Sequence, residues 1–175
     1  MIGPGAAWLI SFRVGGAEAA LPLGVVREVV ARPPVVPVPG SHSFVSGVAL
    51  HGGVALPVYD LRQFSPFWSG PRPVAEGGMA APGEHLIVCD WGEARLALLG
   101  DRVDLLEQAG AGPAGEAGPE RGCAVSHEFV SDVVRRDDGS VVLLDPDRLF
   151  ASLGVPAAGP PGAMEGAGED DPAGR

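Results

Sequence analysis

Two aspartates that end equivalent segments of the chain are the first candidates for chemistry. Asp60 follows the apolar segment LPVY, and Asp145 follows the apolar segment VVLL. Paired carboxylates can share the roles of general acid and general base. An aspartate between a strand and a helical turn also accepts hydrogen bonds from the free backbone N–H groups of that turn, which stabilises it by about 1 kcal/mol. We expect this capping role, rather than catalysis, at both positions.

Histidine, cysteine and serine patterns give no stronger indication of a reactive centre. The histidines show neither HExxH spacing nor the histidine–cysteine clustering of a metal site. The two cysteines are far apart and are expected to be free thiols. No G-x-S-x-G nucleophile motif and no glycine-rich phosphate loop is present. We therefore predict no catalytic residue, no metal and no cofactor. The residues concerned are His42, His51, His85, His127, Cys89 and Cys123.

One hypothesis from the enzyme class remains open. His51 lies beside Gly52 and Gly53, and a small hydrolase or a ligand-binding β-domain could use this imidazole together with nearby carboxylates. Such a domain would need an enclosed pocket around His51.

Composition excludes other classes of function. The formal net charge of −10 argues against binding to nucleic acid, which needs a clustered cationic surface, and against an anionic membrane surface. No run of about 18 apolar residues suggests a membrane span, and no signal peptide is evident. We expect a cytoplasmic protein without direct membrane insertion. At 175 residues, there is no room for an additional receiver or ATP-binding kinase domain, so a stand-alone protein is expected.

The elements that must position these residues occur twice in the chain. FVSGV at residues 44–48 recurs 85 positions later as FVSDV at residues 129–133, and Asp60 and Asp145 have the same offset. Apolar segments bounded by glycine turns predict short strands. The duplication therefore favours two five-stranded β-barrels side by side.

The sequence predicts individual elements within each copy. The Gly52-Gly53 turn predicts a hairpin over residues 44–59. Asp145 as N-cap, Pro146 at the first helical position and Gly154 just past the end predict one short helix. The other strands are expected at residues 8–14, 17–23, 25–32, 85–91, 95–99, 103–107, 123–136 and 140–144, with loops at 65–84 and 108–122.

A possible partner surface lies in the strand expected at residues 25–32. Alternation would place Val26, Glu28 and Val30 on one face. An acidic residue between valines at a strand edge either prevents edge-to-edge aggregation or belongs to a partner surface. The residues themselves leave both alternatives open.

Four segments resemble, in order, those of the CheW-like domain family. LPL at residues 21–23 leads through VREV at 26–29 to PVP at 37–39. FVSGV followed by LPVYDLR at 56–62 is the most specific segment. LLGDRV at 98–103 is similar to the family's G-L-x-V-D-x-V stretch, and LLD at 143–145 with Leu149 and Phe150 is similar to its closing strand and helix.

The resemblance implies a mostly β fold of two intertwined five-stranded SH3-like β-barrels with a short C-terminal helix. It implies a single domain over residues 8–154, with barrel subdomains at roughly 20–84 and 85–145 that exchange strands at their ends. Residues 155–175 are rich in glycine, proline and acidic residues, and we expect them to form a disordered tail.

The resemblance also implies a function. CheW-like domains are non-enzymatic scaffolds that link chemoreceptor signalling tips to a CheA-type histidine kinase in chemotaxis or motility signalling. The implied partners are the cytoplasmic receptor tip, the kinase regulatory domain and other CheW-like proteins, at receptor arrays on the inner face of the membrane. The receptor's helical hairpin would lie in an apolar groove between the barrels, and weak contacts would gain strength by multivalency.

Family contacts can be carried over by position. Val26 and Glu28 fall where the family contacts its kinase. The receptor-contact candidates are Gly47, Val48, His51, Gly52 and Val103.

One position departs from the family. Asn-Leu-Arg-Gly usually precedes the second hairpin strand, whereas this chain has Leu50-His51-Gly52-Gly53, so glycine replaces the arginine. His51 is one residue away, but neighbouring strand positions point to opposite faces. A divergent adaptor that docks on a receptor without engaging the kinase is therefore the alternative to the standard role.

Overall fold

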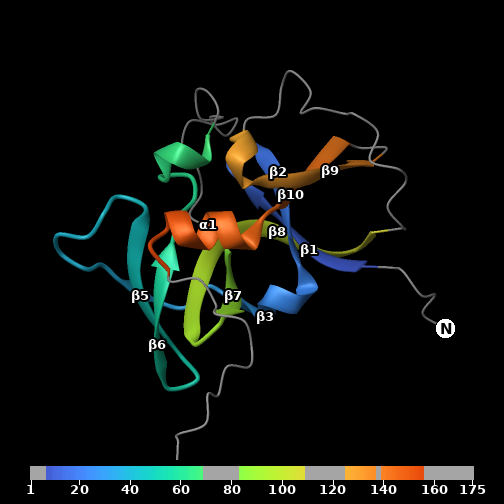
Figure 1. Ribbon diagram of the computed structural model, residues 1–175. Helices are drawn as coiled ribbons and strands as arrows, with labels where there is room; N and C mark the ends of the chain where they lie inside the picture. Colours follow the sequence, from blue (N-terminus) through green and yellow to red (C-terminus); the bar gives the residue numbers. More distant parts are fainter. Residues whose placement is uncertain (1–6, 69–82, 109–124, 137–138, 156–175) are drawn as a thin grey trace, which may run out of the picture.

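The computed structural model describes residues 7–68, 83–108, 125–136 and 139–155 (Figure 1). Within these residues the chain is mostly β, with one short α-helix and three 3-10 helices (η), which confirms the expected fold class. In chain order the elements are β1 (Ala7–Val14), β2 (Ala17–Pro22), η1 (Leu23–Val25), β3 (Val26–Ala31), β4 (Val35–Val36), β5 (Val45–His51), β6 (Val54–Tyr59), η2 (Ser65–Phe67), β7 (His85–Trp91), β8 (Ala94–Gln108), η3 (His127–Phe129), β9 (Val130–Arg136), β10 (Gly139–Leu144) and α1 (Pro146–Ser152).

Strand β8 connects two groups of strands. Its first half lies between β6, which it pairs with in parallel, and β7, which it pairs with in antiparallel orientation. Its second half pairs with β1. From β1 the order of neighbouring strands is β2, β10 and β9. The described strands therefore form one ten-stranded network, and its hydrogen bonds do not close into separate barrels.

Strand β3 pairs away from the strand that precedes it. Only η1 separates β3 from β2 in the chain, yet β3 pairs with β7 of the other group. In the same way, the second half of β8 leaves β7 and pairs with β1. Each group of strands therefore contains segments from both halves of the chain, and Figure 1 shows β5, β6, β7 and β3 on one side and β1, β2, β9 and β10 on the other.

The sequence repeat corresponds to a structural repeat. The backbone N–H of Asp60 donates to the carbonyl oxygen of Phe44 at 2.8 Å, and Asp145 donates to Phe129 at 2.8 Å. The β5–β6 and β9–β10 hairpins both have a register shift at the same repeat position. Their second strands, β6 and β10, each make a parallel pairing with a strand of another hairpin. The duplication inferred from sequence is therefore present in the hydrogen bonding.

The length of β8 differs from expectation. The sequence predicts two strands at residues 95–99 and 103–107, whereas β8 is continuous over 15 residues. Arg102 lies between the two predicted strands with φ of 47°, the left-handed region that non-glycine residues seldom adopt. The register with β1 shifts near this residue. A bulge, rather than a loop, therefore transfers β8 from one group of strands to the other.

Aromatic side chains connect the two copies in the core. Phe64 has its ring centroid 4.9 Å from that of Phe44 and 6.0 Å from that of Phe129, the two equivalent residues of the repeat. Phe129 also stacks on Phe67, at 6.1 Å. Aromatic pairs at these distances add to the hydrophobic stabilisation of the core. The same cluster includes the buried face of α1, formed by Leu149 and the residues near it.

Some predictions fall outside the described residues. They concern Cys123, most of both predicted loops and residues 156–175. Val155, the first residue of the predicted tail, is buried, and its N–H donates to the carbonyl oxygen of Phe150 at 2.9 Å.

Gly47 fills a position at which β4 approaches β5 closely. A Cβ atom on Gly47 would lie 2.1 Å from the carbonyl oxygen of Val36, and the residue has φ of 141°. We expect Gly47→Ala to lower the free energy of unfolding by about 3 kcal/mol, because backbone strain and overpacking act together. Urea denaturation measures this change.

Gly24→Ala is the matched control, because no atom lies within 4 Å of the added Cβ. We expect it to change stability by less than about 0.5 kcal/mol. Equal stability of the Gly47→Ala variant and the unaltered protein would contradict the close approach of β4.

Candidate functional site

The two aspartates have structural roles. Asp60 is buried, and its carboxylate accepts hydrogen bonds from the backbone N–H of Arg62 at 3.0 Å and from the guanidinium of Arg62 at 2.8 Å. The bond to Asp60 raises the pKa of Arg62. Asp145 caps α1 by accepting from the backbone N–H of Arg148 at 3.2 Å. Both carboxylates thus serve local backbone groups, as expected, and Gly154 follows the helix with φ of 80°.

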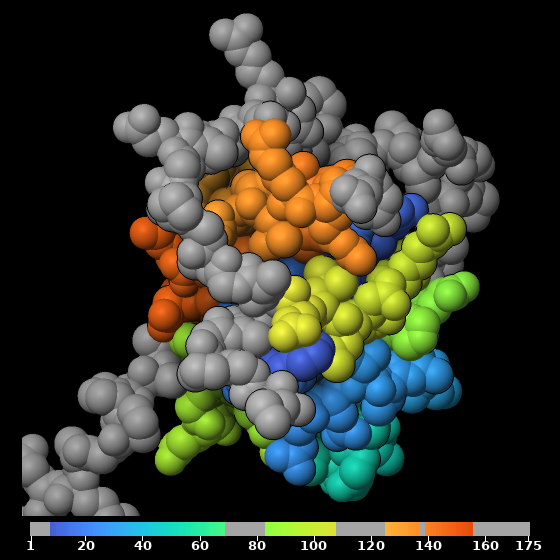
Figure 2. Space-filling view, turned by 90° about the vertical axis from the view of Figure 1, so that its right-hand side faces the viewer, coloured from blue at the N-terminus to red at the C-terminus, as the bar shows by residue number. Residues whose placement is uncertain are grey.

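Glu28 lies on an edge strand. Among the described residues β3 forms backbone pairs with β7 on one side and with no strand on the other. Figure 2 shows the blue segment that contains β3 exposed on the same side of the molecule as the second half of β8 and β9. Within the part of the chain that the structure describes, β3 is therefore an edge strand.

The expectation that Val26, Glu28 and Val30 share one face of β3 is wrong. The register with β7 shifts between Val26 and Glu28, because Arg27 forms a bulge. As a result Val26 and Val29 pack against the larger core cluster, whereas Val30 packs against a second cluster around Leu86. A bulge of this kind breaks the alternation on which the sequence argument depended.

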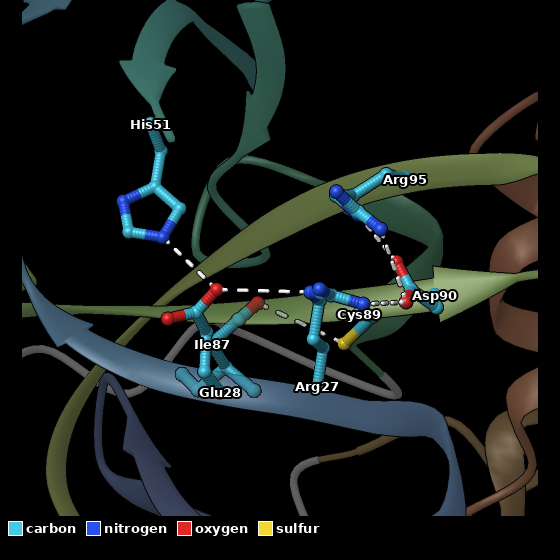
Figure 3. A network of polar contacts seen from close by, with 7 residues as sticks. All are labelled: Arg27, Glu28, His51, Ile87, Cys89, Asp90 and Arg95. Carbon is cyan, nitrogen blue, oxygen red and sulfur yellow. Dashed lines mark hydrogen bonds and ion pairs between the residues drawn. The ribbon is translucent and has the colours of Figure 1, made fainter. Parts of the chain in front are cut away.

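The structure brings His51 and Glu28 together. His51 is the last residue of β5, and its Nε2 lies 3.0 Å from Oε1 of Glu28 (Figure 3). The sequence argument compared His51 only with the position of the family's arginine, which is Gly52 here, and it did not predict this contact. The side chains are 28% and 40% exposed, respectively. This surface location is not the enclosed setting that a hydrolase using His51 would need.

The ion pair belongs to a longer network of charges. Arg27 lies 3.8 Å from Glu28 and 3.1 Å from Asp90, and Arg95 contacts Asp90 at 2.5 Å. The hydrogen bond from Arg95, assisted by Arg27, lowers the pKa of Asp90. Three strands, β3, β7 and β8, and the β5–β6 hairpin are therefore joined at their surface by alternating charges (Figure 3).

The thiol beneath this network is not reactive. Cys89 is fully buried, and burial raises its pKa to about 12. A thiolate is the nucleophilic form of cysteine. Cys89 therefore serves as an apolar core residue, in agreement with the free buried thiol expected from sequence.

An exposed apolar face lies on the outside of β4, β5 and β6. Val48 pairs with Val36 of β4 and with Pro57 of β6, and Leu50 pairs with Ala55. Paired residues in antiparallel strands project to the same side of the sheet. Val36 and Leu50 are 66% and 70% exposed, whereas Ala49 on the opposite side is fully buried. We call Val36, Val48, Leu50, Ala55 and Pro57 the outer apolar face.

Sequence reasoning missed most of this face. Of its residues, Val48 alone was a predicted contact. A signal for this face is present in the sequence, because residues 48–50 are all apolar. A strand with one face in the core needs apolar residues only at alternate positions, so the others point outward.

The other receptor-contact candidates have different locations. Gly47 is buried beneath β4, so it shapes β5 from inside. Gly52 forms the exposed hairpin turn with φ of 57°. Val103 is partly buried and packs against the larger core cluster. Among the five candidates, Val48, His51 and Gly52 therefore lie together at the β5–β6 hairpin, and Val103 lies on β8.

Comparison with known proteins identifies the family. The family model for the CheW-like domain matches residues 9–154. The chain belongs to the CheW-like family. The solved structure of the scaffolding protein TtCheW from Thermoanaerobacter tengcongensis aligns with a TM-score of 0.59 at 18% identity, over 79% of this chain and 88% of that chain. This likeness shows the CheW-like fold. A search of the curated proteins found no match.

Membership places the chain among the scaffold and adaptor domains of chemotaxis signalling, a family of non-enzymatic proteins. In the described residues, no helix has the length and apolar character needed to cross a membrane. The same residues contain no group of three or more potential metal-ligating side chains.

The charge network makes a testable contribution to stability. Because Arg95 and Arg27 lower the folded-state pKa of Asp90, its stabilising effect is present above the unfolded-state pKa of about 3.9 and is lost as the pH falls through the folded-state value. We expect Asp90→Asn to cost less than about 1 kcal/mol at pH 7, since the pair is partly exposed.

The difference in the free energy of unfolding between Asp90→Asn and the unaltered protein should shrink below about pH 4. Urea denaturation at pH 7 and pH 3 measures it, and 1 M salt should reduce it at pH 7. A difference that stays constant with pH would contradict the electrostatic explanation.

Proposed function

We propose that this CheW-like protein is a non-enzymatic scaffold that couples chemoreceptor signalling tips to a CheA-type histidine kinase. The observation that carries this proposal is the family match over residues 9–154. The protein would act in the cytoplasm at receptor arrays, and other CheW-like proteins would be further partners. The outer apolar face and the edge of β3 agree with this role, because they are surfaces for contact rather than groups for a reaction.

The outer apolar face is the proposed contact for the receptor. Val36 and Leu50 are large apolar side chains exposed to solvent, with Val48 between them. A helical hairpin would bury these side chains against its own apolar residues. The hairpin turn and His51 lie at one end of this face. Val48, His51 and Gly52 therefore remain receptor-contact candidates.

The edge of β3 is the proposed contact for the kinase. Val26 and Glu28 are partly exposed on a strand that pairs on one side only within the described residues. A charged residue beside an apolar one gives both affinity and discrimination between partners. The charge of Glu28 would select a partner that presents a cation.

Receptor binding tests the first contact. We expect Leu50→Asp to weaken binding to a purified receptor signalling tip at least tenfold, because it places a charge on the outer apolar face. Isothermal titration calorimetry or pull-down measures binding. Leu105→Asp is the matched control, since Leu105 is 56% exposed on β8 and lies outside this face. Equal binding of both variants would contradict the assignment of the face.

Kinase binding tests the second contact. We expect Glu28→Arg to weaken binding to the kinase regulatory domain at least tenfold, because the reversed charge repels a cationic partner. Glu128→Arg is the control, since Glu128 is an exposed glutamate on η3, away from β3.

The outcomes separate the alternatives. Binding to the receptor tip but not to the kinase would favour the divergent adaptor. Binding of the unaltered protein to neither partner would overturn the proposed function.

A further inference from the structure

The bulge in β3 places a cation beside the candidate contact residue Glu28. Val26 lies opposite Cys89 and Glu28 lies opposite Val88, so Arg27 is the extra residue and has no partner position of its own in β7. A bulge changes the direction of the side chain that it carries. Nε of Arg27 lies 3.8 Å from Oε1 of Glu28, which is beyond hydrogen-bond distance.

The guanidinium of Arg27 is bonded to a different carboxylate. Its Nη1 donates to Oδ2 of Asp90 on β7 at 3.1 Å (Figure 3). Asp90 is itself held by Arg95 on β8, which donates from Nε to Oδ1 at 2.5 Å and from Nη2 to Oδ2 at 3.3 Å. Two donors on one side chain fix the carboxylate in position more firmly than one donor does. Arg27 is therefore drawn toward a fixed anion and away from Glu28.

We propose that Asp90 is a positioning residue for the partner contact at Glu28: it restrains Arg27 and so leaves the Glu28 carboxylate available to a cation of the partner. The restraint is a property of the free protein, whereas its effect on a partner rests on the proposed function. Glu28 is 40% exposed, so a partner side chain can reach it.

The consequence of losing Asp90 follows from the distances. Without that carboxylate, a movement of Arg27 by about 1 Å brings it within hydrogen-bond distance of Glu28. A cation of the partner must then displace Arg27 before it can pair with Glu28. Because exposed ion pairs are weak, this competition is expected to change an equilibrium constant about threefold.

Binding to the purified kinase regulatory domain tests the effect on the partner. We expect Asp90→Asn to weaken binding about threefold. In the Arg27→Met background, which lacks the competing cation, Asp90→Asn should leave binding unchanged. Glu93→Gln is the matched control, because Glu93 is an exposed acidic residue in the turn between β7 and β8 and its substitution removes the same charge. This control should bind like the unaltered protein.

Unfolding of the free protein in urea tests the restraint. A double-mutant cycle with Arg27→Met and Glu28→Gln measures the coupling between these two residues. We expect the coupling to change the unfolding equilibrium constant by less than about 1.5-fold in the unaltered chain and by about threefold in Asp90→Asn. His51 is present in every variant, so its contact with Glu28 does not explain a difference between the two cycles.

The two measurements separate the restraint from the proposed function. An Arg27–Glu28 coupling that is the same in Asp90→Asn would overturn the restraint. Equal weakening of kinase binding by Asp90→Asn in both backgrounds, or by Glu93→Gln, would overturn the role in binding, because loss of negative charge alone would then explain it. Absence of kinase binding by the unaltered protein, with the expected rise in coupling, would overturn the proposed kinase contact and leave the restraint supported.

Discussion

Sharing of strand β8 between two groups of strands is the constraint on which the structure depends. Backbone N–H and C=O groups that are buried must be paired, and β8 satisfies them with β6 and β7 along its first half and with β1 along its second. Neither group can separate without breaking these bonds. The bulge at Arg102 permits the transfer within a single strand.

Both candidate surfaces follow from this arrangement. Because β3 pairs with β7 and with no other described strand, it is an edge that carries Glu28. The β5–β6 hairpin has one side in the core and the other side outward, where β4 extends the sheet without covering its face. The charge network from His51 to Arg95 then joins the hairpin to the edge. A scaffold needs such fixed surfaces more than it needs reactive groups, because weak contacts in an array reinforce one another.

Side chains that could take part in a reaction have structural roles in this protein. Asp60 and Asp145 hold backbone N–H groups at the ends of equivalent strands. Cys89 is buried, with a raised pKa. The half-exposed ion pair of Glu28 and His51 likewise joins two strands at the surface.

The sequence by itself determined the repeat, the mostly β class, the hairpin turns, the helix caps and the family resemblance, because these depend on local patterns of turn residues and alternating side chains. Tertiary structure decided what depended on pairing between distant strands. It joined residues 95–99 and 103–107 into β8, placed a bulge at Arg27 that ended the alternation of β3, and brought His51 to Glu28. It also exposed Leu50 while burying Gly47. A register shift of one residue moves a side chain to the other face, and such shifts arise from contacts that no local pattern contains.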